Sequence, residues 1–326
     1  MKNLLRLILG ALLAAGLTAQ PKLTVLSTDI ATDIDDTWAL AHLLRSPELD
    51  LRFVLTETGE ARHRAAVAAK LLEVAGRTDV DVGLGVDFGV MGEAERHQGP
   101  WVADYDLAAY PGTLHEDGVA AFIRLIEAAE TEVTVIAIGP VPSLAEAVRR
   151  APHIAAKCRL IGMHGSVDVG YGGSAEPAAE YNVANNVPAF RTVMAAAWKS
   201  IELTPLDTCG LVDLDGANYH AVWRATDDPL LRAVIENYCI WAPRVPWMTC
   251  DFFTQRSSTL FDDVAVYMAY ASDLLEYETV RYDVTDAGFM RRDSTGPFEA
   301  RFALRWRDLP AFERHLADRL TGRALP

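Results

Sequence analysis

The chain reads TDIATDIDDTWAL at residues 28–40, and this stretch decides the fold. Its four carboxylates fall within eight residues: Asp29, Asp33, Asp35 and Asp36. A short apolar, strand-like run at residues 23–26 comes before it, and a helical pattern of apolar residues follows it. The acids therefore lie in a turn between a buried strand and a helix N-terminus, where open α/β sheets bind their ligands.

The crowding of negative charge in this turn indicates a metal site. Acids this close repel one another unless a cation or protons intervene, and oxygen ligands suit a hard ion such as Ca²⁺ or Mg²⁺. The alternative is that one or two of the acids cap the helix while the others are solvated. Capping accounts for Asp35 or Asp36 but not for all four, so we expect a bound cation.

Strand-like and helix-like segments alternate along most of the chain. The expected strands are residues 23–27, 51–56, 80–84, 133–138, 160–163 and 201–206, and the expected helices are residues 36–44, 62–74, 117–129, 143–150 and 189–197. Residues 213–277 are mainly helical in pattern, with an apolar helix at 260–271, and a strand pair (279–284, 301–306) and a helix (309–320) close the chain. This alternation predicts an α/β fold: an open, mostly parallel sheet with helices on both faces, in a single domain.

Composition and the N-terminus restrict the partners and the location. The chain has 326 residues, half of them hydrophobic, and a formal net charge of −15, which argues against nucleic acid and anionic membranes as partners. Lys2 and Arg6 precede an apolar run at residues 7–17 and small residues up to Ala19. This layout predicts a signal peptide over 1–19, a mature domain over 20–326 and an exported protein, periplasmic or secreted, with no membrane contact after cleavage. The alternative is an apolar first element of the fold.

The sequence does not determine whether the four cysteines form disulfides or are free thiols. Their spacing matches no zinc or redox motif, and disulfides and core thiols are equal alternatives in an exported protein. The four are Cys158, Cys209, Cys239 and Cys250.

Three further segments gain meaning from their order after the acidic turn. Residues 55–60 end the second strand in a polar, glycine-containing turn, residues 179–186 hold an acid and several amides before a helix, and residues 258–266 place Asp262 at a helix start. Each alone is ordinary loop chemistry. In this order, the chain resembles the inosine–uridine nucleoside hydrolase family from about residue 23 to the last helix.

The resemblance is carried first by the acidic turn. The family's first motif has the form Asp-Thr-Asp-Pro-Gly-x-Asp-Asp, and a bacterial exported branch has the longer form Asp-Ile-Gly-Thr-Asp-x-Asp-Asp. The turn matches the longer form, with Ala31 in the glycine position. The resemblance implies a calcium-dependent hydrolase that cleaves the N-glycosidic bond of ribonucleosides to ribose and free base. We also expect a small-molecule ribonucleoside as the ligand and a homodimer or homotetramer as the assembly.

Site residues follow from the resemblance, position by position. It implies that Asp29 is both the general base and a calcium ligand. The other implied calcium ligands are Asp36, Asp262 and the backbone carbonyl of Ile138. The implied ribose contacts are Asp35 and the Glu-x-Asn pair Glu180 and Asn182.

The implied chemistry suits these residue types. Cleavage of a ribosyl C–N bond passes through a cation-like sugar, which negative groups stabilise. A bound Ca²⁺ chelates the ribose hydroxyls and holds the attacking water, from which a carboxylate removes a proton. The scheme is inverting and non-covalent, like that of glycosidases that activate a water.

Three positions depart from the family pattern. Phe261 stands where many members have the histidine that protonates the leaving base, Glu60 stands near an expected asparagine, and Ser174 replaces a ribose-contacting asparagine. The metal-binding frame is intact, whereas leaving-group and sugar contacts are altered. Other candidates for leaving-group contacts are His97, His164, Trp241 and Trp247. The alternative for His97 is an exposed loop histidine, and for His164 a hydrogen-bonded core histidine. For Trp241 and Trp247 it is packing at the corners between helices.

Two other functions compete with nucleoside hydrolysis. Residues 33–37 fit the Asp-x-Asp-x-Thr motif of haloacid dehalogenase-type phosphatases, although Asp33 lies six residues beyond the strand-like run instead of directly after it. The other is an exported, non-catalytic ribose- or nucleoside-binding protein, which Phe261 and Ser174 favour.

Overall fold

The computed structural model describes residues 20–89, 92, 96–245 and 255–323. The predicted signal peptide, Trp247 and Cys250 lie outside the described residues. Within these ranges, no helix has the length and apolar character that crossing a membrane requires.

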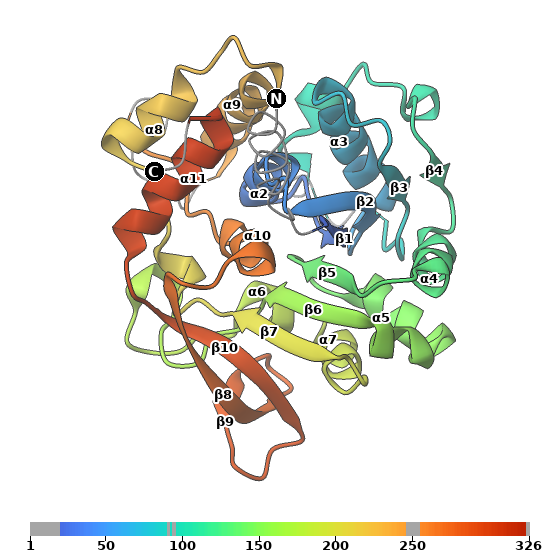
Figure 1. Ribbon diagram of the computed structural model, residues 1–326, viewed down its shortest axis with the longest axis vertical. Coiled ribbons are helices and arrows are strands. Elements are labelled where there is room, and N and C mark those ends of the chain that lie inside the picture. The colour runs from blue at the N-terminus through green and yellow to red at the C-terminus, as the bar shows by residue number, and fades with distance from the viewer. Residues whose placement is uncertain (1–19, 90–91, 93–95, 246–254, 324–326) are drawn as a thin grey trace, which may run out of the picture.

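A single ten-stranded sheet runs through the molecule in the order β4-β3-β2-β1-β5-β6-β7-β10-β8-β9 (Figure 1). Neighbours from β4 to β10 pair in parallel, and β8 pairs antiparallel with β10 and β9. The strands are β1 Lys22–Thr28, β2 Leu49–Thr56, β3 Asp81–Gly83, β4 Leu114–His115, β5 Val133–Ala137, β6 Cys158–Met163, β7 Ser200–Thr204, β8 Leu275–Val284, β9 Met290–Arg292 and β10 Phe298–Trp306.

Helices cover both faces of this sheet (Figure 1). The α-helices are α2 Asp35–Leu44, α3 Ala61–Val74, α4 Gly118–Ala128, α5 Pro142–Arg150, α6 Tyr181–Ala184, α7 Val187–Met194, α8 Gly216–Trp223, α9 Pro229–Trp241, α10 Asp263–Tyr270 and α11 Leu309–Thr321. Among the short 3₁₀ turns, η5 (Tyr171–Gly173) and η6 (Cys209–Leu211) lie near the candidate site. The predicted fold class, a mostly parallel α/β sheet in one domain, is confirmed.

The alternation of side chains along the central strands explains the two helical layers. In β1, Val25 belongs to the core cluster that contains residues of α4, α5 and α7, whereas Leu26 belongs to the cluster with α2, α3, α9 and α10. In β5, Val135 and Ile136 divide between the clusters in the same way. Because successive strand residues point to opposite faces, an unbroken apolar strand needs cover on both.

The register brings the carboxyl ends of the central strands to one edge. Thr28, which ends β1, pairs with Thr56 of β2, and Ser27 pairs with Ala137 of β5. From β1 the chain builds β2, β3 and β4 on one side, and β5 starts the other side. The acidic turn therefore leaves β1 at the point where the order of the sheet reverses, as expected for a ligand site in an α/β fold.

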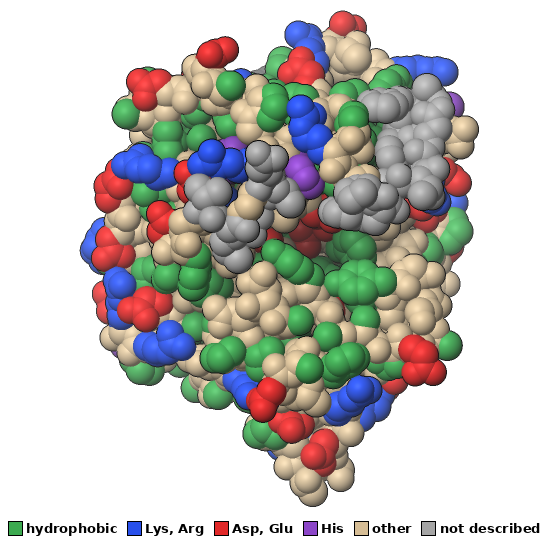
Figure 2. Space-filling model, turned by 180° about the vertical axis from the view of Figure 1, so that it is seen from behind, with side chains coloured by type: hydrophobic (Ala, Val, Ile, Leu, Met, Phe, Trp, Pro, Cys, Tyr) green, Lys and Arg blue, Asp and Glu red, His purple; other side chains and the backbone are tan. Residues whose placement is uncertain are grey.

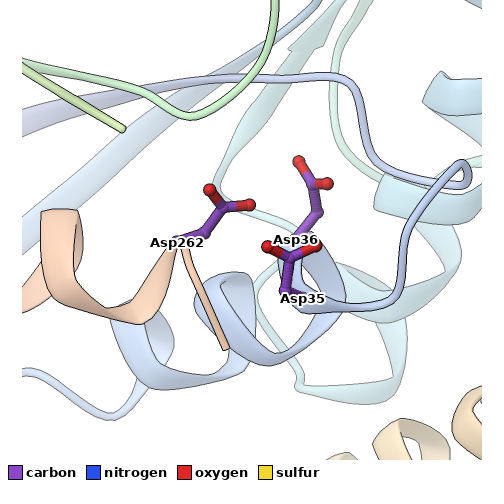
Figure 3. A group of neighbouring side chains, drawn as sticks. All are labelled: Asp35, Asp36 and Asp262. Carbon is purple, nitrogen blue, oxygen red and sulfur yellow. The ribbon is translucent and has the colours of Figure 1, made fainter. Parts of the chain in front are cut away.

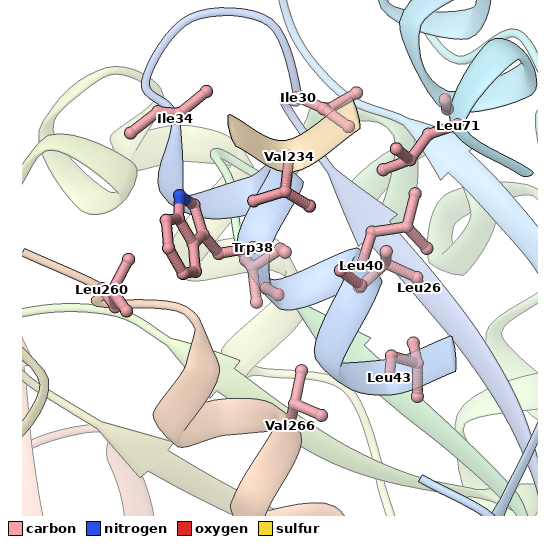
Figure 4. Packing of buried hydrophobic residues seen from close by; sticks show 14 of the residues in the cluster. Leu26, Ile30, Ile34, Trp38, Leu40, Leu43, Leu71, Val234, Leu260 and Val266 are labelled. Carbon is pink, nitrogen blue, oxygen red and sulfur yellow. The ribbon is translucent and has the colours of Figure 1, made fainter. Parts of the chain in front are cut away.

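Helix α2 is held on the sheet by a buried aromatic side chain. Trp38 has no exposed surface, lies near Ile34, Val234 and Leu260 (Figure 4), and meets Tyr238 edge to face at 6.1 Å between ring centroids. The indole thus packs α2, which carries two of the site acids, against α9.

We expect Trp38→Ala to lower the free energy of unfolding by about 3–5 kcal/mol, because it opens a large cavity under α2. Denaturant unfolding followed by circular dichroism measures this. Phe88→Ala is the control: Phe88 is 49% exposed, and its loss should change stability by less than about 0.5 kcal/mol. Equal effects of the two variants would contradict this account of the core.

Candidate functional site

Three buried carboxylates from two helix starts converge at the edge of the sheet. Asp35 and Asp36 begin α2, and Asp262 directly precedes α10 (Figure 3). Each offers a carboxylate oxygen within 4.8 Å of those of the other two, and all three side chains are buried. We call these three residues the acid group.

The acid group does not cap its helices. The N-cap of α2 is Ile34, which makes no side-chain capping bond, and the Asp262 side chain makes none at the N-cap of α10. Asp36 instead accepts a hydrogen bond from the Thr28 hydroxyl at the end of β1. The capping interpretation of these acids is therefore wrong, and their oxygens face one another.

Burial and mutual repulsion act on all three acids. Burial raises the pKa of Asp35 well above its usual value, and the neighbouring acids raise it further. The same two causes raise the pKa of Asp36, although the Thr28 hydrogen bond opposes them. For Asp262, burial and then the charges of Asp35 and Asp36 raise the pKa well above its ordinary value. Such a group is costly to ionise without a counter-cation.

The acid group suits a hard divalent cation. Its donors are all carboxylate oxygens, the ligand type that Ca²⁺ and Mg²⁺ prefer, and they already converge at one point. A cation there would supply the positive charge that these buried acids require. The structure thus brings the predicted ligands Asp36 and Asp262 together, and it adds Asp35, for which a ribose contact is predicted.

Asp29 lies beside the acid group, at the end of β1. It contributes to the raised pKa of Asp35, Asp36 and Asp262, so its charge acts on all three. Its carboxylate also lies against the backbone of Gly139, where any Cβ would collide with it. Glycine at this position therefore leaves room for the Asp29 carboxylate, one residue after the predicted ligand Ile138.

Asn182 connects the ends of two neighbouring strands. Its side-chain amide donates hydrogen bonds to the carbonyl of Ile138 (3.3 Å) and to that of Met163 (3.0 Å). Glu180 accepts from the backbone N–H groups of Asn182 (2.7 Å), Val183 (3.2 Å) and Gly165 (2.8 Å). Burial nevertheless raises the Glu180 pKa to about 7, with these donors opposing the shift. Both residues of the Glu-x-Asn pair are buried and held in place.

An apolar rim lies in the region of Phe261, next to the acid group. Tyr171 of η5 meets the Phe261 ring edge to face at 6.3 Å between centroids. Tyr171 is 45% exposed and Leu211 of η6 is 41% exposed, so apolar surface faces solvent here. On the face shown in Figure 2, acidic side chains are visible in a hollow that apolar side chains border. Phe261 thus belongs to a small aromatic surface that Tyr171 extends.

Two predicted leaving-group residues meet at one carbonyl of the acidic turn. His97 hydrogen-bonds to the backbone carbonyl of Thr32 and is buried. The Trp241 indole N–H donates to the same carbonyl at 3.1 Å, and its ring is buried against Tyr238. In this arrangement both side chains brace the turn that carries Asp33.

The other predicted candidates, His164, Glu60 and Ser174, make hydrogen bonds within the fold. His164 is a buried histidine whose Nε2 bonds to the Gly139 carbonyl at 3.0 Å, and burial lowers its pKa to about 4. Glu60 accepts a hydrogen bond from Arg96 (2.8 Å), and the exposed Ser174 accepts one from the Glu176 N–H (3.1 Å). Roles for Glu60 and Ser174 in sugar binding stay predictions.

Sequence reasoning did not find two residues that the structure places at the site, Arg64 and Tyr171. The one available signal for Arg64 was its position among Ala65, Val67 and Ala68, on the face of α3 that faces the core. Tyr171 lies in a glycine-rich segment without periodicity, which gave no signal. Cys158 and Cys209 are buried free thiols, and Cys239 is a half-buried one.

Comparison with known proteins agrees with this geometry. The family profile described as inosine-uridine preferring nucleoside hydrolase matches residues 24–310. Uridine nucleosidase 1 of Arabidopsis thaliana is 30% identical over 163 residues, which are 48% of this chain and 48% of that protein. The aligned part of the chain thus spans about half the length of the curated relatives it matches.

Solved structures share the fold over nearly the whole chain. A plant nucleoside hydrolase, the PpNRh1 enzyme, superposes with a TM-score of 0.74 at 20% identity, covering 92% of this chain and 99% of its own. A purine-preferring ribonucleoside hydrolase from Gardnerella vaginalis gives a TM-score of 0.70 at 20% identity, covering 93% and 99%.

Fold and site together define an α/β protein with a cluster of buried acids at the carboxyl edge of its parallel sheet. With the profile match over most of its length, the chain belongs to the inosine-uridine preferring nucleoside hydrolase family. The family is metal-dependent, and the acid group is a cluster of carboxylates in this chain that could hold a metal ion.

We expect Asp262→Asn to raise the melting temperature in a chelating buffer by about 2–4 °C, because it removes one of the mutually repelling buried carboxyls. Added Ca²⁺ should stabilise the parent protein by mass action and the variant far less. Differential scanning fluorimetry with EDTA and then with Ca²⁺ measures both effects. Asp104→Asn, at an exposed position, is the control and should follow the parent protein in both buffers. An Asp262→Asn variant less stable than the parent in EDTA would show that repulsion does not dominate the site.

Proposed function

We propose that this protein hydrolyses the N-glycosidic bond of ribonucleosides, giving ribose and a free base. The observation that carries the proposal is the convergence of Asp35, Asp36 and Asp262 beside Asp29, at the reversal point of the sheet. Membership in the nucleoside hydrolase family and the similarity to a plant uridine nucleosidase support it.

We further propose that the acid group, Asp29 and the Ile138 carbonyl hold Ca²⁺. Bound there, the ion would hold the attacking water and the ribose hydroxyls in place and would lower the pKa of that water. The oxygen-only donor set is the support for Ca²⁺ over softer metals.

The chain's own residues then divide the remaining work. Asp29 removes the proton of the attacking water, and its position against Gly139 keeps its carboxylate at the site. Asn182 and Glu180 hold the sugar, and both are fixed by backbone contacts of β6 and α6. The negative charge of the acid group and Asp29 stabilises the positive charge that develops on the ribose as the bond to the base breaks.

The departing base needs different help in this chain. Phe261 cannot donate a proton, and with Tyr171 it offers an apolar surface instead. This observation keeps a second candidate function open: an exported protein that binds ribosides without turning them over. The phosphatase alternative is not retained, because the chain belongs to the nucleoside hydrolase family.

We propose in addition that residues 1–19 direct export and that the mature chain works as a homodimer or homotetramer in the periplasm or outside the cell. N-terminal sequencing of the exported protein and light scattering of the purified protein test these two points.

Asp29→Asn should reduce kcat by at least about 10²-fold, because the general base is lost while the shape of the side chain is kept. Steady-state kinetics on a ribonucleoside measures this. Asp33→Asn is the matched control in the same turn and should lose much less. A near-normal kcat in Asp29→Asn would remove Asp29 as the base.

We expect p-nitrophenyl riboside to be cleaved with a kcat/KM far above that of inosine or uridine. Nitrophenolate leaves without protonation, whereas a purine or pyrimidine needs a proton that a positioned acid normally supplies, at a gain of about 10²–10⁴-fold. The three substrates are compared with and without chelator, and chelator should abolish all turnover. Equal rates for inosine and the nitrophenyl compound would reveal a hidden acid, and His97→Ala and His164→Ala would then identify it. If no riboside is cleaved but ribosides bind, the binding function is correct.

A further inference from the structure

Two turns at the site adopt a backbone conformation that L-residues avoid. In the described part of the chain, the non-glycine residues with positive φ are Ala31 (95°) and Thr58 (27°). Ala31 lies in the acidic turn after β1, and Thr58 lies in the turn after β2, the neighbouring strand. In such residues Cβ approaches the backbone carbonyl closely, so each conformation is strained and persists only where its surroundings enforce it.

One buried side chain binds both strained turns. The Nη1 atom of Arg64 donates to the backbone carbonyls of Asp29 and Ile30, the latter at 3.0 Å. The same atom lies 2.8 Å from the hydroxyl oxygen of Thr32, and Nε donates to the Thr58 carbonyl at 2.6 Å. The acceptors in the acidic turn flank Ala31 on both sides, and the acceptor in the other turn is the strained residue itself.

The environment of Arg64 makes this contact rigid. Arg64 projects from the first turns of α3 and is only 1% exposed. A buried guanidinium is stable only where acceptors replace its hydration, and here backbone carbonyls of the two turns are among them. Its planar fork fixes the direction of each hydrogen bond, so it holds the two turns at a set distance from each other.

We propose that Arg64 is a positioning residue that holds the turns at Ala31 and Thr58 in their strained conformations and so places Asp29 for the reaction. Arg64 binds the backbone of Asp29 itself, and a small displacement of a reacting group costs rate steeply. The role in placing a general base rests on the proposed function, whereas the role in holding the turns does not.

The positive φ of Ala31 explains why the acidic turn needs the hydrogen bonds of Arg64. Glycine reaches positive φ without a Cβ clash, so a glycine at this position would allow the turn to form unaided. Alanine requires external contacts, which Arg64 supplies on both sides of it. The effect of replacing Arg64 should therefore depend on whether residue 31 is alanine or glycine.

The first test is the sign of the stability change in Ala31→Gly. Where φ is positive, replacing alanine by glycine relieves strain, and we expect the melting temperature to rise by roughly 2 °C. Ala66→Gly is the control on α3, where glycine should lower the melting temperature because the site is helical. A fall in Ala31→Gly like that in Ala66→Gly would overturn the strain on which the proposal depends.

The second test measures the turn directly, without substrate. Hydrogen–deuterium exchange of peptides covering residues 28–37 should speed up at least tenfold in Arg64→Met, while peptides of β8 and β10 keep the parent rate. Arg62→Met is the matched control two residues away: Arg62 is exposed, pairs with Glu116, and should leave the exchange of residues 28–37 unchanged. Unchanged exchange in Arg64→Met would overturn the proposal.

The third test asks whether the two residues are coupled in catalysis. We expect Arg64→Met to lower kcat about 10²-fold with a smaller change in KM, and Ala31→Gly in that background to recover about tenfold. Arg64→Lys keeps the charge but not the fork and should also lose rate, which separates hydrogen bonding from charge. If Arg64→Met does not fold, Arg64→Lys replaces it in these experiments.

A merely structural Arg64 would change the melting temperature but leave no coupling between the two sites in kcat, and this outcome would overturn the catalytic part. If the parent protein turns over no riboside, the proposed function fails. The exchange and melting experiments then decide the positioning role by themselves.

Discussion

The repulsion among buried carboxylates is the constraint on which the rest of this structure depends. Asp35, Asp36 and Asp262 are buried with their carboxylate oxygens facing one another, and Asp29 adds its charge to theirs. Isolated charges in such surroundings are unstable, so the fold must hold them together by other means. The core beneath α2, the hydrogen bond from Thr28 and the buried Arg64 all serve this purpose.

The longer strands of the fold were predictable from sequence. A strand that is buried on both faces appears in the sequence as an unbroken run of apolar residues. The segment that became β1 and the acids after it are of this kind, and so are the strands β5 and β6. The two-residue strand β4 and the three-residue strand β9 are too short to carry a period, and both were missed. Their pairing depends on neighbours distant in the chain and not on their own residues.

The site shows the same division. Asp36 and Asp262 were found by their motif, and the structure brings them together. The equal place of Asp35 in the acid group depends on how α2 faces α10, which no local pattern encodes. Arg64 was missed because its partners are mainly backbone carbonyls, and any sequence presents the same carbonyls at every position. His97 and Trp241 both contact the Thr32 carbonyl. They are far from Thr32 in the sequence, so only the folded chain brings the three together.

The acid group also joins two segments that lie far apart in the sequence. Asp36 follows β1, the first strand of the sheet, and Asp262 comes after β7, in the last third of the sequence. An ion bound between them would close the chain from residue 36 to residue 262 into a ring, with the topological effect of a reversible cross-link. The ring can close only once the chain is folded, so an unfolded chain in transit carries no preformed site for the ion. Once it is closed, a proteolytic cut in a surface loop between the two acids would leave both fragments tethered through the ion.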